Sequence, residues 1–178
     1  MPVERARRQQ FHDLFVVMLP EVRTWLRRQG LDQDVDDVAA EVFTVVWRRW
    51  SDVPRELGDR RAWVYGVAHN KVRQARAASA KAQDRSALGV FDPTAPGPDP
   101  ATRVVGDDWV HRALQMLPPS EREAVSLTLL ADLSPTQAAH AAGCSVTAMT
   151  TRLARARARL ERFAASQQYQ PEPTGRTR

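Results

Sequence analysis

The spacing of apolar side chains along this chain predicts a series of amphipathic α-helices. In the N-terminal half we expect helices over residues 10–29, about 34–49 and about 61–80. Pro20 should kink or divide the first of them, because its ring cannot take part in the backbone hydrogen bonding of a helix interior. Four further helices are expected between residues 106 and 165, with Ser120 capping the second of them. The pattern therefore predicts an all-α fold.

A proline-rich stretch divides the chain. FDPTAPGPDP, residues 91–100, holds four prolines and few side chains to bury, which is typical of an extended linker. We expect two small helical domains joined by this flexible linker, the second ending in a helix-turn-helix. The expected segments are a flexible N-terminus over 1–9, a helical domain over 10–80, the linker over 81–105, a helix-turn-helix domain over 106–165 and a disordered tail over 166–178.

The stretch LSPTQAAHAAGCSVTAMTTRLARARARL, near the end of the second domain, predicts two helices joined by a tight turn. Ser134 caps the first helix, and Pro135 follows at the first helical position, where a missing N–H costs nothing. Gly143 can take the left-handed backbone that ends this helix, and Ser145 caps the next. The alanines between them let the two helix backbones approach closely, as a helix-turn-helix requires.

The second helix of this pair is apolar on one side. Its expected core stripe is Met149, Leu153, Ala156, Leu160 and Phe163. The opposite side carries Thr147, Ala148, Thr151 and Arg155, and Arg159 and Arg162 continue it toward the C-terminus. Threonines that approach base edges and arginines that bind guanine or phosphate suit the major groove of DNA. A solvated amphipathic helix is the simpler interpretation, but the capped turn favours DNA reading.

The net charge of +5 and the pI of about 10.3 favour a polyanionic partner. The charge is spread unevenly: residues 31–41 carry five acids and no base, whereas residues 60–81 carry six bases and no acid. Two partners of different character are therefore expected for the N-terminal half. The acidic helix is apolar on two adjacent sides, which is typical of the centre of a small bundle. Its remaining polar strip, Asp37, Glu41, Thr44 and Arg48, could still dock a partner.

The helix over 61–80 interleaves aromatic and basic side chains, among them Trp63, Arg61, Lys71 and Arg73. Together with the neighbouring loop over 51–60, this composition suits a single-stranded nucleic acid, because rings stack on bases and cations hold phosphates. Trp63 taken alone is more often a core residue. Both interpretations stay open at this stage.

Other classes of chemistry find few residues here. Cys144 is the only cysteine, so the chain has no internal disulfide and no cysteine-based metal cage, and it is most simply a small buried side chain. The four histidines are scattered without ligand spacing, and no nucleotide-binding glycine loop or hydrolase motif is present. We therefore expect no enzyme activity, cofactor or metal. No run is long enough to cross a bilayer and no signal peptide is visible, which predicts a cytoplasmic protein.

The order of these helices resembles the extracytoplasmic-function (ECF) group of bacterial sigma factors, short forms that keep only the second and fourth sigma domains. The resemblance covers most of residues 11–165 and rests on three stretches. They are DVDDVAAEVFTVVWR from Asp34, RAWVYGVAHNKVR from Arg61 and LPPSEREAVSLTLLADLSPTQAAHAAGCSVTAMTTRLARAR from Leu117. These look like the helix that binds core polymerase, the helix that meets the minus-ten promoter element and the domain that reads the minus-thirty-five element.

The resemblance implies an alternative sigma factor that binds core RNA polymerase, directs it to specific promoters and helps to open the minus-ten region. The implied polymerase contacts are Asp37, Glu41, Thr44 and Arg48. The implied minus-ten contacts are Arg60, Arg61, Trp63, Asn70, Lys71 and Arg73, and the implied minus-thirty-five contacts are Thr147, Ala148, Thr150, Thr151, Arg152, Arg155 and Arg159. The implied partners are promoter DNA, the clamp helices of the polymerase's largest subunit and the flap of the second-largest subunit. Relatives are commonly held inactive by an anti-sigma protein.

The chain departs from the family pattern at three positions: Ala40 stands where Gln is usual, Thr147 replaces a frequent Gly, and Thr150 replaces a frequent Lys or Arg. The alternative function is a helix-turn-helix regulator whose N-terminal bundle senses a ligand or forms a dimer, although neither an α/β receiver nor a ligand-pocket pattern is visible. A nucleoid protein, which would bind DNA without regard to sequence, is a third interpretation.

Overall fold

The structure is a computed structural model that describes residues 2–31, 35–87 and 105–168. Its helices are α1 (Pro2–Arg28), α2 (Val35–Arg48), η1 (Trp50–Asp52), α3 (Leu57–Ala87), α4 (Val105–Gln115), α5 (Pro119–Val125), η3 (Ser126–Leu130), α6 (Pro135–Ala142) and α7 (Val146–Gln168). No strand occurs in the ranges described. The all-α prediction is confirmed.

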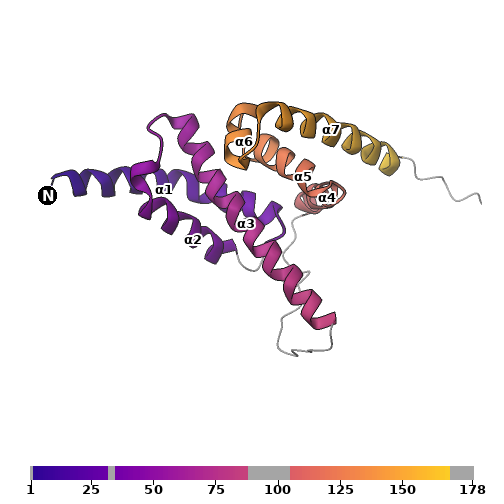
Figure 1. Ribbon diagram of the computed structural model, residues 1–178, viewed down its shortest axis with the longest axis horizontal. Helices are drawn as coiled ribbons and strands as arrows, with labels where there is room; N and C mark the ends of the chain where they lie inside the picture. Colours follow the sequence, from indigo (N-terminus) through magenta and orange to yellow (C-terminus); the bar gives the residue numbers. More distant parts are fainter. Residues whose placement is uncertain (1, 32–34, 88–104, 169–178) are drawn as a thin grey trace, which may run out of the picture.

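The N-terminal half is a bundle of α1, α2 and α3 (Figure 1). The helix α2 packs against both of the others, so its two apolar sides place it at the centre of this bundle. One helix runs through Pro20, against the expectation of a break. Pro20 is exposed, whereas Met18 and Val22 on either side are buried, so the packing of the inner side holds the helix together.

Three predicted segment boundaries differ from the structure. Residues 2–9, expected to be frayed, continue α1, and Arg7 anchors them by donating from Nη2 to the carbonyl oxygen of Trp47 at 2.8 Å. The Arg7 guanidinium also lies 4.3 Å from the centroid of the Trp47 ring. The helix α3 continues to Ala87 instead of ending near Ala80, and α7 continues to Gln168. The remainder of the expected linker and tail lies outside the described residues.

The predicted helix-turn-helix is formed by α6 and α7. The hydroxyl oxygen of Ser134 accepts from the Gln137 backbone N–H at 3.2 Å, and the Gln137 side chain accepts in return from the Ser134 N–H at 3.0 Å. Gly143 ends α6 with φ of 68°. The Ser145 hydroxyl then accepts from the Ala148 N–H at 3.1 Å. The local rules for caps therefore predicted this turn correctly.

Ser120 is not a cap, contrary to the prediction. The residue at the N-cap position of α5 is Pro118, and Pro119 occupies the first helical position. The fixed φ of proline suits the first turn of a helix, so the helix begins one residue earlier than the serine would place it.

Replacing Ser134 with alanine is expected to lower the free energy of unfolding by about 1 kcal/mol, because the Gln137 N–H loses its acceptor at the start of α6. Chemical denaturation measures the change. The matched control is Ser120→Ala, which removes an exposed hydroxyl that caps nothing. Equal losses from the two variants would show that the capping box has no role.

The two halves of the chain share one hydrophobic core. Its larger cluster combines buried side chains of α1, α2 and α3 with Ala124, Leu127, Ala138, Ala139 and Met149 from the C-terminal half. The contact between α3 and α6 is the most extensive between any two described helices, and Figure 1 shows α6 beside the N-terminal part of α3. A smaller cluster joins α4, α5 and α7 through Leu114, Leu117, Val125 and Ala156. The helical units are therefore packed together as one body.

Candidate nucleic-acid interface

The helix α7 turns its apolar stripe inward, as predicted. Met149 and Ala156 are fully buried, and Leu153, Leu160 and Phe163 are half-buried. Of the positions predicted to face DNA, Thr147, Thr150, Thr151 and Arg155 are exposed and Ala148 is half-buried. The hydroxyls of Thr150 and Thr151 donate to the Thr147 carbonyl at 3.0 and 2.8 Å, which leaves their oxygen lone pairs outside the helix as acceptors.

Two arginines predicted to contact DNA are engaged within the molecule. Arg152 Nη1 lies 3.0 Å from Glu123 Oε2, and Arg159 Nε lies 2.9 Å from Glu121 Oε2. Both acids belong to α5, and Glu121 is only 5% exposed, so these pairs hold α7 against α5. Arg155 is exposed and has no ion pair among the described residues. The DNA contacts of Arg152 and Arg159 stay predictions, whereas their structural contacts are visible.

Glu123 joins three helices. Its Oε1 lies 2.6 Å from Nε2 of His69 on α3, and its Oε2 meets Arg152 of α7. Burial alone would raise the pKa of this carboxyl, but the contact with His69 and the charges of His69, Arg152 and Arg73 outweigh it and lower the pKa below its ordinary value. Glu123 is therefore held as a carboxylate between the two halves of the chain.

The residues predicted to meet the minus-ten element lie along α3 but in different surroundings. Arg60 donates from Nε to the Pro54 carbonyl at 3.0 Å and from Nη2 to the Arg55 carbonyl at 2.7 Å, and so shapes the preceding loop. Arg61 pairs with Glu21 and also donates to the Ala131 carbonyl at 3.3 Å. Both guanidinium groups are therefore engaged by the protein itself.

The other predicted minus-ten residues are more accessible. Trp63 is half-buried and packs against the core with one side, so each of its two interpretations describes part of the ring. Asn70 and Arg73 are exposed, and Asn70 lies two turns beyond Trp63 on the same side of α3. Lys71 Nζ forms an ion pair with Glu41 Oε2 at 2.7 Å, which links a predicted DNA contact to a predicted polymerase contact.

A small pocket lies in the loop before α3, and sequence reasoning did not locate it. Its volume is about 230 Å³, and it is lined by Gln10, Trp50, Ser51, Val53, Pro54, Arg55 and Arg60. The only sequence signal was the loop itself, which carries Pro54 and Gly58.

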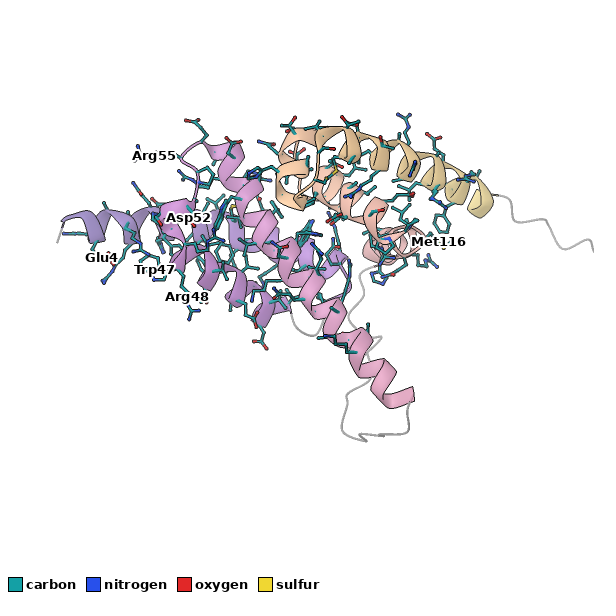
Figure 2. The ribbon with its side chains drawn as sticks, viewed as in Figure 1. Glu4, Trp47, Arg48, Asp52, Arg55 and Met116 are labelled. Atoms are coloured by element: carbon teal, nitrogen blue, oxygen red, sulfur yellow. The ribbon has the colours of Figure 1, made fainter. Side chains whose placement is uncertain are left out.

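The predicted polymerase contacts Asp37, Glu41, Thr44 and Arg48 are all exposed on α2, and Figure 2 shows Arg48 pointing away from the bundle. Beside them lies an apolar groove of about 480 Å³ between α1 and α2, which Thr44 also lines. Four aromatic rings, Phe11, Phe15, Phe43 and Trp47, form its walls. The sequence showed the second apolar side of α2 but gave no sign that part of it borders an open groove.

Comparison with known proteins decides the family. Residues 107–160 match the family model described as Sigma-70, region 4. The RNA polymerase sigma factor CnrH of Cupriavidus metallidurans is 30% identical over 139 residues, which cover 72% of each chain. The chain belongs to the ECF sigma factors. It is an alternative sigma factor, which binds core RNA polymerase, directs it to promoters and helps to open them, and the regulator interpretation is not favoured.

Solved structures agree with the fold of this sigma factor. CnrH in complex with the cytosolic domain of CnrY superposes with a TM-score of 0.66 at 25% identity, covering 89% of this chain and 90% of the other. The sigma factor RpoE of Bartonella quintana in complex with the anti-sigma factor NepR gives a TM-score of 0.68 at 24% identity, covering 88% and 98%. No described helix is both long and apolar enough to span a membrane.

Proposed function

We propose that three surfaces of this sigma factor divide the work of initiation. The first is the exposed start of α7, which reads the minus-thirty-five duplex through Thr147, Thr151 and Arg155. The observation that carries this assignment is that these side chains are exposed while the opposite side of α7 is buried in the core. Small hydroxyls followed by an arginine on one side of a helix match the depth and the donor pattern of the major groove.

The second surface binds the opened minus-ten strand. Asn70 and Arg73 are exposed on α3, and the half-exposed ring of Trp63 lies on the same helix. The pocket of about 230 Å³ before α3 can enclose one flipped base, with Trp50 as an apolar wall and Arg60 as a donor. Extruding a base costs a few kcal/mol of stacking energy, which such a pocket offsets.

The third surface binds protein. The polar strip of α2 and the aromatic groove beside it dock the clamp helices of the polymerase's largest subunit, and the C-terminal half contacts the flap of the second-largest subunit. Aromatic side chains bordered by charges are typical of protein interfaces. An anti-sigma factor is a further partner, supported by two similar sigma factors solved with a second protein. The chain makes or breaks no covalent bond itself and acts in the cytoplasm, where the polymerase works.

Replacing Arg48 with glutamate is expected to weaken binding to purified core polymerase at least tenfold, because it reverses a charge in the proposed contact. Titration of a labelled chain with core polymerase measures the affinity. Arg55→Glu is the matched control: it makes the same charge change at an exposed arginine on the loop before α3, away from Arg48 (Figure 2). A wild-type chain that failed to bind core polymerase would refute the function, whereas equal losses in both variants would refute the docking surface alone.

A further inference from the structure

The contact between the two DNA-reading halves is too close for an incidental arrangement. Gly66 of α3 faces Ala141 of α6, and a Cβ at residue 66 would lie 3.4 Å from both the Cα and the carbonyl oxygen of Ala141. The alanines of α6 allow this approach, and Ala138 and Ala139 are fully or almost fully buried. The side of α6 turned to α3 is therefore fitted to that helix.

Polar groups across the same boundary are also paired. The indole Nε1 of Trp25 on α1 donates to the Ser126 carbonyl of η3 at 3.0 Å, in a buried hydrogen bond between residues 101 positions apart. The side chain of Gln29 donates to the Ser126 hydroxyl. Buried polar groups are costly without partners, so each half satisfies groups that the other half exposes.

Glu123 completes the contact. One carboxylate oxygen meets His69 of α3 and the other meets Arg152 of α7, at 2.6 and 3.0 Å. His69 is 5% exposed and precedes Asn70, whereas Arg152 follows Thr151. The two helices that read promoter DNA are thus joined through a single side chain.

This arrangement does not fit a promoter. Elements named for positions minus ten and minus thirty-five lie about 25 base pairs apart, which is about 85 Å along B-form DNA. Helices joined through one carboxylate cannot reach both elements at once. This step rests on the proposed function, which assigns α3 and α7 to different elements.

We propose that the structure is a closed, promoter-incompetent form of the sigma factor, and that the α3–α6 contact with the His69–Glu123–Arg152 cluster is an intramolecular latch. Core polymerase opens the latch when it binds the two halves at separate places. The chain is long enough for this: residues 88–104 span at most about 60 Å, and α3 beyond Asn70 adds about 25 Å. The free protein therefore has its DNA-reading helices occupied with each other until it joins the polymerase.

A reversible cross-link tests the latch. The Cβ positions of residues 66 and 141 lie 3.6 Å apart, within the range of a disulfide. The variant carries Gly66→Cys and Ala141→Cys in a Cys144→Ala background, which removes the one native thiol. We expect mild oxidation to join the two positions in the full-length chain, and the single-cysteine variants, treated in the same way, should form no internal bond. Failure of the double variant to cross-link would show that the halves do not lie together in solution and would overturn the closed form.

The functional consequence is read in transcription. Oxidised and reduced chains are each combined with core polymerase on linear genomic DNA, and transcripts are sequenced. We expect the oxidised chain to initiate at least tenfold less at the promoters used by the reduced chain, with full recovery after reduction. Equal initiation by the cross-linked chain would overturn the latch. Absence of promoter-specific transcripts from the reduced and wild-type chains alike would instead refute the proposed function, while the cross-linking yield would still report on closure.

Discussion

Replacing Trp25 with alanine is expected to lower the free energy of unfolding by about 3–5 kcal/mol. Trp25 is 1% exposed and packs edge-to-face on Tyr65, with ring centroids 5.7 Å apart. Its removal empties a large volume where α1, α3 and η3 meet, and it leaves the buried Ser126 carbonyl without the indole donor. Urea denaturation followed by circular dichroism measures the change.

The variant Trp25→Phe separates the two contributions. Phenylalanine keeps most of the apolar ring but cannot donate to Ser126, so we expect a smaller loss of about 1–3 kcal/mol. A Trp25→Ala chain that unfolded at the same urea concentration as the wild type would show that the boundary between the halves is not packed in solution. Because Trp25 contacts residues of both halves, loss of a single cooperative transition in Trp25→Ala would indicate that the halves then unfold separately.

The turn between α6 and α7 was predictable because its determinants are local. The capping box joins residues three positions apart, and Gly143 is required by its own positive φ. No distant residue is needed to form these contacts, so residue types and spacing were sufficient. Ser120 shows the limit of this reasoning, because two good helix starters compete within two residues and the prolines before it set the start.

The packing of the two halves was not predictable from the same rules. The sequence indicated two helical units joined by a linker, but nothing in the spacing of apolar side chains states which outer sides face each other. The approach of Gly66 to Ala141 depends on the complementary shapes of helices that are distant in sequence. The bond from Trp25 to Ser126 likewise joins positions that no local pattern relates.

The arginines of α7 illustrate the same limit at the candidate site. A helical wheel places Arg152, Arg155 and Arg159 outside the core stripe, and this was correct. It cannot show that Glu123 and Glu121 of α5 bind the first and the last of them. Acids in the first turn of α5 were visible in the sequence, but the dipole of their own helix was a sufficient reason for them. Only the tertiary structure singles out Arg155.

Replacing Arg155 with alanine is expected to weaken binding of the holoenzyme to promoter duplex by about 10- to 100-fold, the cost of about 1–3 kcal/mol for losing one arginine contact to a base edge. Arg155 lies two turns beyond Ser145 on the exposed side of α7 and has no ion pair among the described residues, so its guanidinium is available to DNA. Gel-shift titration against a fragment that carries the upstream element, at fixed salt concentration, measures the affinity.

The matched control is Arg157→Ala, which removes an exposed arginine from the same helix. Arg157 pairs with Glu161 one turn further along, so its charge is already partly neutralised, and we expect less than a threefold change. The dependence on DNA sequence distinguishes the possible roles of Arg155. A base contact predicts a larger loss on the preferred element than on unrelated duplex, whereas a phosphate contact predicts the same loss on both and a salt dependence reduced by about one ion. Equal affinities for wild type and Arg155→Ala would mean that the reading surface lies elsewhere on the C-terminal half.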